Sequence, residues 1–179
     1  MKMKLAGDYQ KELVALLEAN ASQSAITAKA LEAAEATIAQ TFPAIYPDAA
    51  KKITCRQSCG HCCRQSSIMI EEADALLLAG VTGRSINYAP VDASAWAGKA
   101  CVFLDANDNC SVYEHRPMTC RMSLSVDDPD LCRTEAERKM IVLKPLYELL
   151  TLGIQGKNMQ RYIASRGSEA DIRAFFPPI

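Results

Sequence analysis

The sequence has 179 residues, of which 49% are apolar and 23% are charged, and its formal net charge is -1. A chain of this length and composition can bury a core, which excludes an intrinsically disordered protein. The balanced charge provides no long-range attraction to phosphate, and no run approaches the about 18 apolar residues of a membrane span. We therefore expect neither a nucleic-acid partner nor a membrane location.

The N-terminal part of the chain has the pattern of amphipathic helices. Residues 8–40 contain no Gly or Pro, and apolar residues recur there at three- and four-residue steps, with Asp8 as an N-cap. Side chains in 20–24 compete for backbone hydrogen bonds, which favours two helices over one. Residues 41–54, with two prolines, are expected to form a linker. We therefore predict an N-terminal helical arm over 1–42.

The middle of the chain alternates short elements with turns. Residues 66–70 are expected to be extended, and 71–79 to form a helix that Gly80 ends. Two β-prone runs, 101–105 and 110–113, flank an Asn/Asp turn and predict a hairpin. Pro117 fits the first position of a short helix.

Helical periodicity returns in the C-terminal part. We predict a helix over 129–152 that has one buried face and a kink at Pro145. A further helix is predicted over 156–165. Ser168 begins a capping-box pattern for a last helix that reaches Phe176. The predicted fold is mainly α: a small single-domain helical protein with a cysteine-rich metal-binding lobe that contains a short β-hairpin. The lobe corresponds to 53–125, and the helices of 126–179 are expected to pack on the same domain.

Eight cysteines are the strongest chemical signal, and four of them lie in the nine residues from Cys55 to Cys63. No targeting segment is visible, so we expect a cytoplasmic protein, in which clustered thiols bind metal more often than they form disulfides. Thiolates suit zinc, copper(I) or iron–sulfur clusters. Without metal, the lobe from Cys55 to Cys132 is expected to lose order.

The spacing leaves the identity of the metal open. Gly60 permits the tight turn that brings nearby sulfurs together. The adjacent Cys62 and Cys63 rarely bind one tetrahedral ion, so one of them is a spare or second-site ligand, or the centre is polynuclear. The spacing Cys55-x3-Cys59-x2-Cys62 also matches the radical S-adenosylmethionine signature for a 4Fe–4S cluster, but the chain that follows is too short and too helical for the barrel of that superfamily.

The whole constellation resembles the YkgJ-like cysteine-cluster family of zinc- or iron-chelating proteins. Its CxxxCxxCC block, its C-x-F-L segment and its C-x-x-Y-x-x-R-P-x-x-C-R segment are all present in order, over about 53–125. The resemblance marks as candidate ligands Cys55, Cys59, Cys62, Cys63, Cys101, Cys110 and Cys120. It also places Arg116 and Arg121 beside the site, where they would offset thiolate charge. Cys132 lies outside the pattern.

Other candidate residues have less to support them. Cys132 is either a ligand or a buried free thiol. His61 is expected to hydrogen-bond to a ligand, His115 to lie on the surface, and Tyr113 to belong to the core. No Ser/His/Asp set and no phosphate-binding loop is present, so no catalytic residue and no reaction are assigned.

Three functions agree with these residues. The first is an iron–sulfur or zinc protein with a redox or accessory role. The second is a non-catalytic structural-zinc module whose N-terminal helices bind a protein partner or a second copy of the chain. The third is a metal chaperone or buffer. For the N-terminal helices, packing on their own domain remains the alternative to docking or self-association.

Overall fold

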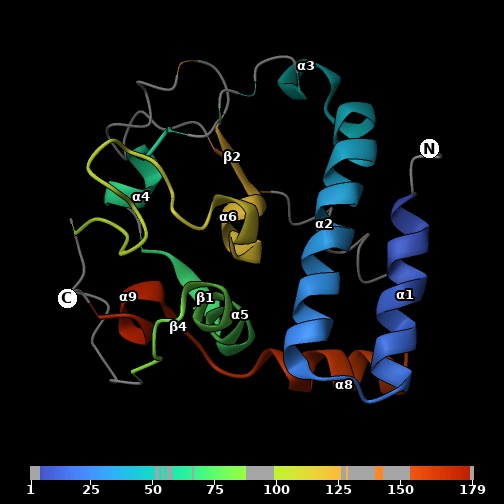
Figure 1. The fold of residues 1–179 in the computed structure, drawn as a ribbon. Helices are drawn as coiled ribbons and strands as arrows, with labels where there is room; N and C mark the ends of the chain where they lie inside the picture. The colour runs from blue at the N-terminus through green and yellow to red at the C-terminus, as the bar shows by residue number, and fades with distance from the viewer. Residues whose placement is uncertain are drawn as a thin grey trace.

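The computed structural model describes residues 5–50, 53, 55, 58–65, 67–87, 99–125, 128, 140–142 and 154–177. Helices α1 (Ala6–Glu18) and α2 (Gln23–Ile45) run side by side in opposite directions (Figure 1). Between them Asn20 has a positive φ of 50°, and the Ser22 hydroxyl accepts the Ala25 N–H. The predicted break is confirmed. The predicted N-cap is wrong, because α1 begins before Asp8 and has Leu5 as its N-cap.

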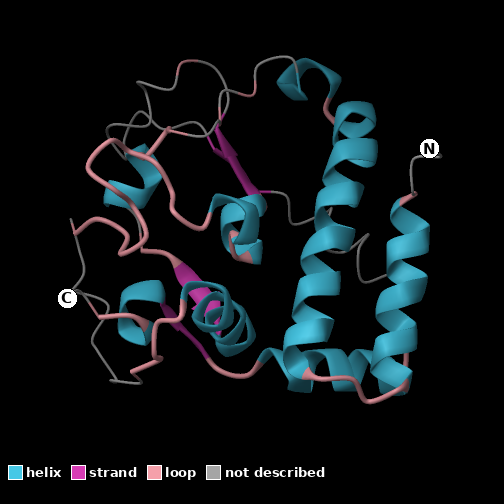
Figure 2. Cartoon of the chain, in the orientation of Figure 1, coloured by secondary structure: helices cyan, strands magenta, loops and turns pink. Residues whose placement is uncertain are grey.

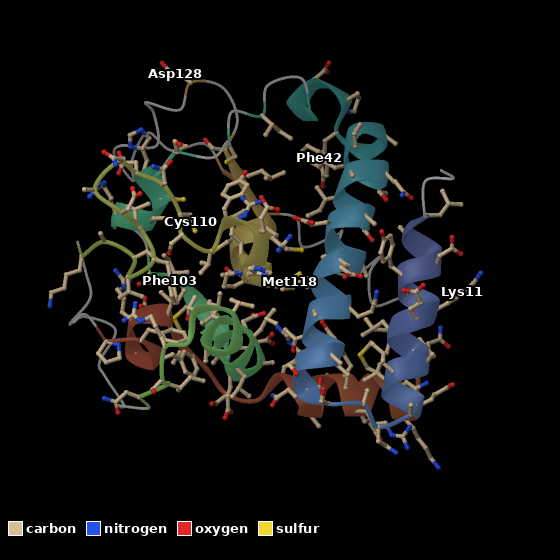
Figure 3. All side chains as sticks on the ribbon, in the orientation of Figure 1. Lys11, Phe42, Phe103, Cys110, Met118 and Asp128 are labelled. Atoms are coloured by element: carbon tan, nitrogen blue, oxygen red, sulfur yellow. The ribbon has the colours of Figure 1, made fainter. Side chains whose placement is uncertain are left out.

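The predicted linker after residue 40 is largely wrong. Helix α2 continues through Pro43 to Ile45, and α3 (Pro47–Ala50) follows almost at once. Packing explains the extension: Phe42 is 2% exposed, and its ring contacts that of Tyr46 at a centroid distance of 5.4 Å (Figure 3). Burial of this last turn offsets the hydrogen bond that Pro43 cannot donate.

A two-stranded antiparallel sheet joins the middle of the chain to its end. Strand β1 (Met69–Glu71) pairs with β4 (Glu169–Asp171), with Met69 opposite Asp171. The extended segment predicted near 66–70 and the helix after it are confirmed. That helix, α5 (Glu72–Thr82), passes Gly80 and ends at Gly83, which adopts a left-handed φ of 69°.

The last predicted helix begins later than its capping-box pattern indicates. Residues Glu169–Asp171 form strand β4, because pairing with β1 satisfies their backbone groups. Helix α9 (Ile172–Phe175) then starts with Asp171 as N-cap, whose carboxylate accepts the Arg173 N–H at 2.9 Å. Strand pairing therefore replaces the first turn of the predicted helix.

A second small sheet pairs β2 (Ser123–Ser125) with β3 (Met140–Val142). The helix predicted over 129–152 is therefore wrong at 140–142, where the sequence Met-Ile-Val suits a strand that finds a partner. The rest of that prediction, including Pro145, lies outside the described residues. So does Cys132.

The remaining elements are short (Figure 2), and two of them contain cysteines: α4 (His61–Gln65), the 3-10 helix η2 (Tyr113–His115) and α6 (Met118–Arg121). The chain reverses where the hairpin was predicted, held by one antiparallel bridge between Leu104 and Cys110. Pro117 is the N-cap of α6, one position before its predicted place.

Helix α8 (Lys157–Arg166) confirms the helix predicted there and crosses the ends of α1 and α2 (Figure 1). The N-terminal helix pair packs on its own chain, against α8, α5 and α6.

One apolar core lies between these helices and includes Leu13, Leu17, Phe42, Met118 and Tyr162. A second core lies beneath the cysteines and includes Ile70, Leu78, Phe103, Ile172 and Phe175. The mainly helical fold is confirmed, and none of the described helices is long and apolar enough to cross a membrane.

Candidate metal centre

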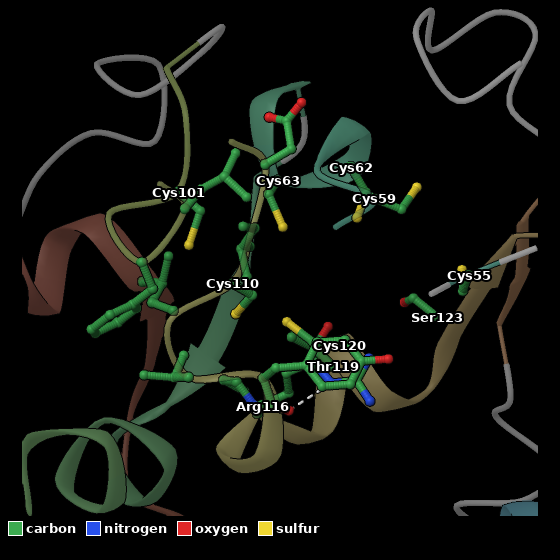
Figure 4. A pocket seen from close by; sticks show the side chains of 18 of the residues that line it. Cys55, Cys59, Cys62, Cys63, Cys101, Cys110, Arg116, Thr119, Cys120 and Ser123 are labelled. Carbon is green, nitrogen blue, oxygen red and sulfur yellow. Dashed lines mark hydrogen bonds between the residues drawn. The ribbon is translucent and has the colours of Figure 1, made fainter. Parts of the chain in front are cut away.

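One cavity of about 240 Å³ collects the predicted sulfur ligands. All seven candidate cysteines line it: Cys55, Cys59, Cys62, Cys63, Cys101, Cys110 and Cys120. They come from separate parts of the chain: the loop before α4, α4 itself, the turn of 101–110, and α6 (Figure 4). Folding thus brings together thiols that lie up to 65 positions apart in the sequence.

The first cysteine block is held against the turn that carries the later cysteines. The Cys101 N–H donates to the Cys63 carbonyl at 2.7 Å. Arg64 donates from Nε to Asp108 Oδ1 at 2.8 Å, and the Ser58 hydroxyl donates to the amide oxygen of Asn109 at 2.5 Å. These contacts hold α4 and the turn on adjoining walls of the cavity.

An aspartate organises that turn. Asp105 Oδ1 accepts the N–H groups of Asn107 and Asn109, each at 2.8 Å, and Asp108 adopts a positive φ of 62°. The Asn109 N–H holds the pKa of the Asp105 carboxyl below its ordinary value. The predicted Asn/Asp turn is therefore present and self-stabilised.

Gly60 lies directly before α4 and close to this turn, and Gly60→Ala is expected to impair the site. A Cβ at this position would lie 2.9 Å from Asp108 Oδ1 and 3.0 Å from Leu104 Cδ1. We expect a loss of about 1–3 kcal/mol in unfolding free energy, together with weaker metal binding. Thermal melts and metal titrations of the variant measure both effects.

Gly80→Ala is the matched control for that substitution. Gly80 lies inside α5, and an added Cβ would meet nothing within 4 Å. Alanine favours a helix interior by roughly 0.5–1 kcal/mol, so this variant is expected to be more stable and to bind metal normally. If Gly60→Ala matched Gly80→Ala in both measurements, close approach at Gly60 would not be required.

The wall formed by residues 110–121 contributes two cysteines and one cation. The Arg116 guanidinium lies 3.8 Å from the centroid of the Tyr113 ring, and its Nε donates to the Tyr113 carbonyl at 3.0 Å. Both side chains line the cavity. The positive charge of Arg116 partly opposes the rise in the pKa of Cys110 and Cys120.

Burial and crowding keep the metal-free thiols protonated. The pKa of Cys63 is raised, chiefly by the hydrogen bond with Cys62 and by burial. Burial raises the pKa of Cys101 from an ordinary 9.0 to about 11, and it also raises the pKa of Cys110 and Cys120. Neighbouring thiols add to each rise, which shows that these sulfurs lie within electrostatic range of one another.

The outer edge of the cavity is more accessible. Cys62 is exposed, whereas Cys101 is buried and the other cavity cysteines are half-buried. At this edge Cys55 Sγ accepts the Ser125 N–H at 2.9 Å, which ties the first cysteine to β2. The cavity thus has an enclosed side around Cys101 and a side that reaches solvent at Cys62.

The donor set suits a soft metal. Thiolates bind zinc, copper(I) or iron–sulfur clusters, whereas magnesium and calcium select oxygen. Among the described residues, however, no three His, Cys, Asp or Glu side chains are placed as ligands of a single ion. The described cysteine sulfurs line the cavity but do not converge on the position of a single ion.

Several other residues differ from their predicted places. Arg121 was expected beside the thiols, but it does not line the cavity and forms an ion pair with Glu35 of α2. His61 begins α4, and its hydrogen bond to a ligand stays a prediction, whereas His115 is exposed as expected. Tyr113, predicted as core, lies on the cavity wall.

Asp108 was missed as a cavity residue. The sequence signals only its turn, and its ion pair with Arg64 depends on how α4 packs.

Residues 54–144 match the model of the CxxCxxCC family, whose description is "Putative zinc- or iron-chelating domain". The chain belongs to this family. The match spans all seven cavity cysteines and leaves α1, α2, α8 and α9 outside the family domain. The predicted resemblance is thereby confirmed, and with it the coarse assignment of zinc or iron chelation through cysteines. Searches of curated proteins and of solved structures give no match.

Proposed function

We propose that this CxxCxxCC protein holds an iron–sulfur cluster in the cavity and acts as a redox or accessory protein. The observation that carries the proposal is the convergence of seven cysteines on one cavity. A mononuclear zinc site needs four ligands, so seven thiols exceed what one ion can use. A polynuclear centre takes ligands from a wider perimeter, which suits sulfurs contributed by separate segments.

The dimensions of the cavity support the same conclusion. Its volume of about 240 Å³ far exceeds the roughly 30 Å³ that one water molecule takes up in the liquid. No three described side chains meet as ligands of a single ion. A cluster of iron and sulfide fills more space than a zinc ion, and it would bridge these thiols with smaller movements of the chain.

The charge balance of the cavity also suits several bound thiolates. Bound thiolates are anionic, and Arg116 lines the cavity to compensate part of that charge. Asp108, the acidic side chain on the wall, is already paired with Arg64. Apolar groups such as Phe103 and Ile172 line the other side, where they limit access of water to the centre.

The test is metal analysis of protein purified without oxygen. We expect iron with acid-labile sulfide and a broad absorption band near ~400 nm that bleaches on reduction. Anaerobic handling matters, because zinc can replace a cluster after exposure to oxygen. Colourless anaerobic protein with stoichiometric zinc would contradict the proposal.

That contradicting result would support a second candidate, a structural zinc site. A closed zinc site needs four ligands, and the seven cysteines that line the cavity are enough to supply them. The two candidates also differ in redox behaviour, since zinc has no accessible second oxidation state. Reversible reduction in a potentiometric titration would support the cluster and its redox role.

The raised thiol pKa values predict proton release on metal binding. At pH 7 these thiols are protonated, and a metal binds thiolate, so each ligand must lose its proton. Affinity is therefore expected to rise with pH, by about tenfold per pH unit for each proton displaced. Metal titration in weakly buffered solution, with a pH indicator, measures the number of protons. Release of fewer than two protons per chain would show that the metal does not bind several thiols.

A further inference from the structure

Arg121 is the residue next to Cys120, but its side chain does not line the cavity. The side chain is 5% exposed, and burial lowers the pKa of the guanidinium. A buried charge is costly unless its hydrogen-bonding groups are satisfied. The partners of this guanidinium therefore indicate why an arginine is buried here.

Two of its partners are carbonyl groups in the chain between Cys110 and Cys120. Arg121 Nε donates to the Arg116 carbonyl at 2.7 Å, and Nη2 donates to the Glu114 carbonyl at 2.5 Å. These carbonyls lie at the end of η2, the turn that carries Tyr113 and Arg116 on the cavity wall. The guanidinium thus holds this turn from behind the cavity.

The third partner lies in the N-terminal helix pair. Arg121 Nη1 forms an ion pair with Glu35 of α2, whose side chain is 55% exposed. Helix α2 also packs against α6 through the shared core that contains Met118. The three nitrogen atoms of the Arg121 guanidinium therefore connect α6, which carries this residue, to η2 and to α2.

We propose that Arg121 is a positioning residue of the metal centre: it fixes the turn between Cys110 and Cys120 in its metal-binding form and couples metal binding to α2 through Glu35. The inference rests on the proposed function, because it gives the residue a role in metal binding by the same cavity. Lysine cannot replace the guanidinium. Its single ammonium group lacks the planar fork that reaches two carbonyls and a carboxylate at once.

The test compares Arg121→Lys with Arg166→Lys in the full chain. Arg166 is the matched control: its side chain is 4% exposed and pairs with Glu71 and Asp74, and it does not line the cavity. The probe is Co²⁺, whose thiolate absorption reports on ligand geometry. We expect Arg121→Lys to lower Co²⁺ affinity about 10- to 100-fold and to change the absorption spectrum. Arg166→Lys is expected to lower the melting temperature and to leave affinity and spectrum as in the wild type.

Three outcomes overturn the inference. The first is wild-type affinity and spectrum in Arg121→Lys. The second is an equal loss of affinity in Arg166→Lys, which would reduce the effect to general stability. The third is no effect in Glu35→Gln, which keeps both carbonyl contacts and removes only the ion pair; we expect it to weaken Co²⁺ binding about threefold.

Glu35→Gln also carries the test if Arg121→Lys does not fold. Failure of the wild type to bind Co²⁺ or any other metal would instead overturn the proposed function. The two failures are therefore distinguishable.

Discussion

Cys120→Ser is expected to weaken metal binding about 100-fold and to lower stability together. Cys120 lies in α6 on the cavity wall, where Cys101, Cys62 and Cys110 are close enough to raise the pKa of its thiol. Structural metal sites contribute an apparent 10–16 kcal/mol through about four ligands, so one ligand accounts for roughly 3 kcal/mol, or about 100-fold in affinity. Serine keeps the size of the side chain and supplies a much poorer soft-metal ligand.

Metal content after gel filtration and the melting temperature of the metal-loaded protein measure this effect. Met122→Leu is the control, because Met122 is buried directly after α6 and the substitution nearly conserves volume. It is expected to cost less than about 1.5 kcal/mol and to leave the metal content unchanged. Full metal content in Cys120→Ser would remove this cysteine from the ligand set.

The candidate ligands could be predicted from the sequence because their chemistry and spacing are local. The four cysteines from Cys55 to Cys63 indicate a soft-metal site without any knowledge of the fold. The later cysteines depended on the family resemblance, since nothing in their spacing requires Cys101 and Cys120 to meet. The structure brings them to one cavity through contacts such as the Cys101–Cys63 backbone hydrogen bond.

The largest errors in the fold come from partners that are distant in the sequence. Residues Glu169–Asp171 and Met140–Val142 become strands because each segment pairs with a strand that lies elsewhere in the chain. Helix α2 passes Pro43 because Phe42 is buried against the core. Local propensity cannot report such contacts, and tertiary packing overrides it.

The two arginines of the family pattern show the same limit within the site. The resemblance placed Arg116 and Arg121 beside the thiols as a pair. The structure separates their roles: Arg116 lines the cavity, and Arg121 binds carbonyls and Glu35 behind it. Adjacent positions in a short helix face different surroundings, so a motif identifies such residues without giving their direction.

Removal of the metal is expected to loosen the cysteine-rich part of the chain and to spare the N-terminal helix pair. The walls of the cavity are short elements joined by few backbone hydrogen bonds, such as Cys101 N–H to Cys63 and Ser111 N–H to Phe103. Helices α1 and α2, by contrast, bury Leu13, Leu17 and Phe42 in the first apolar core, which is separate from the core beneath the cysteines. Metal–sulfur bonds are therefore expected to supply most of the order around the cavity.

Amide hydrogen exchange before and after chelation measures this difference. A local loss of about 3 kcal/mol corresponds to about 100-fold faster exchange, which we expect at Cys101 and Ser111. The amides of Leu13 and Leu17 in α1 serve as internal controls and are expected to change less than tenfold, because their stability comes from apolar packing. Equal acceleration in both groups would mean that the metal stabilises the whole chain as one unit, and no acceleration at the cavity would mean that the thiols hold no structural metal.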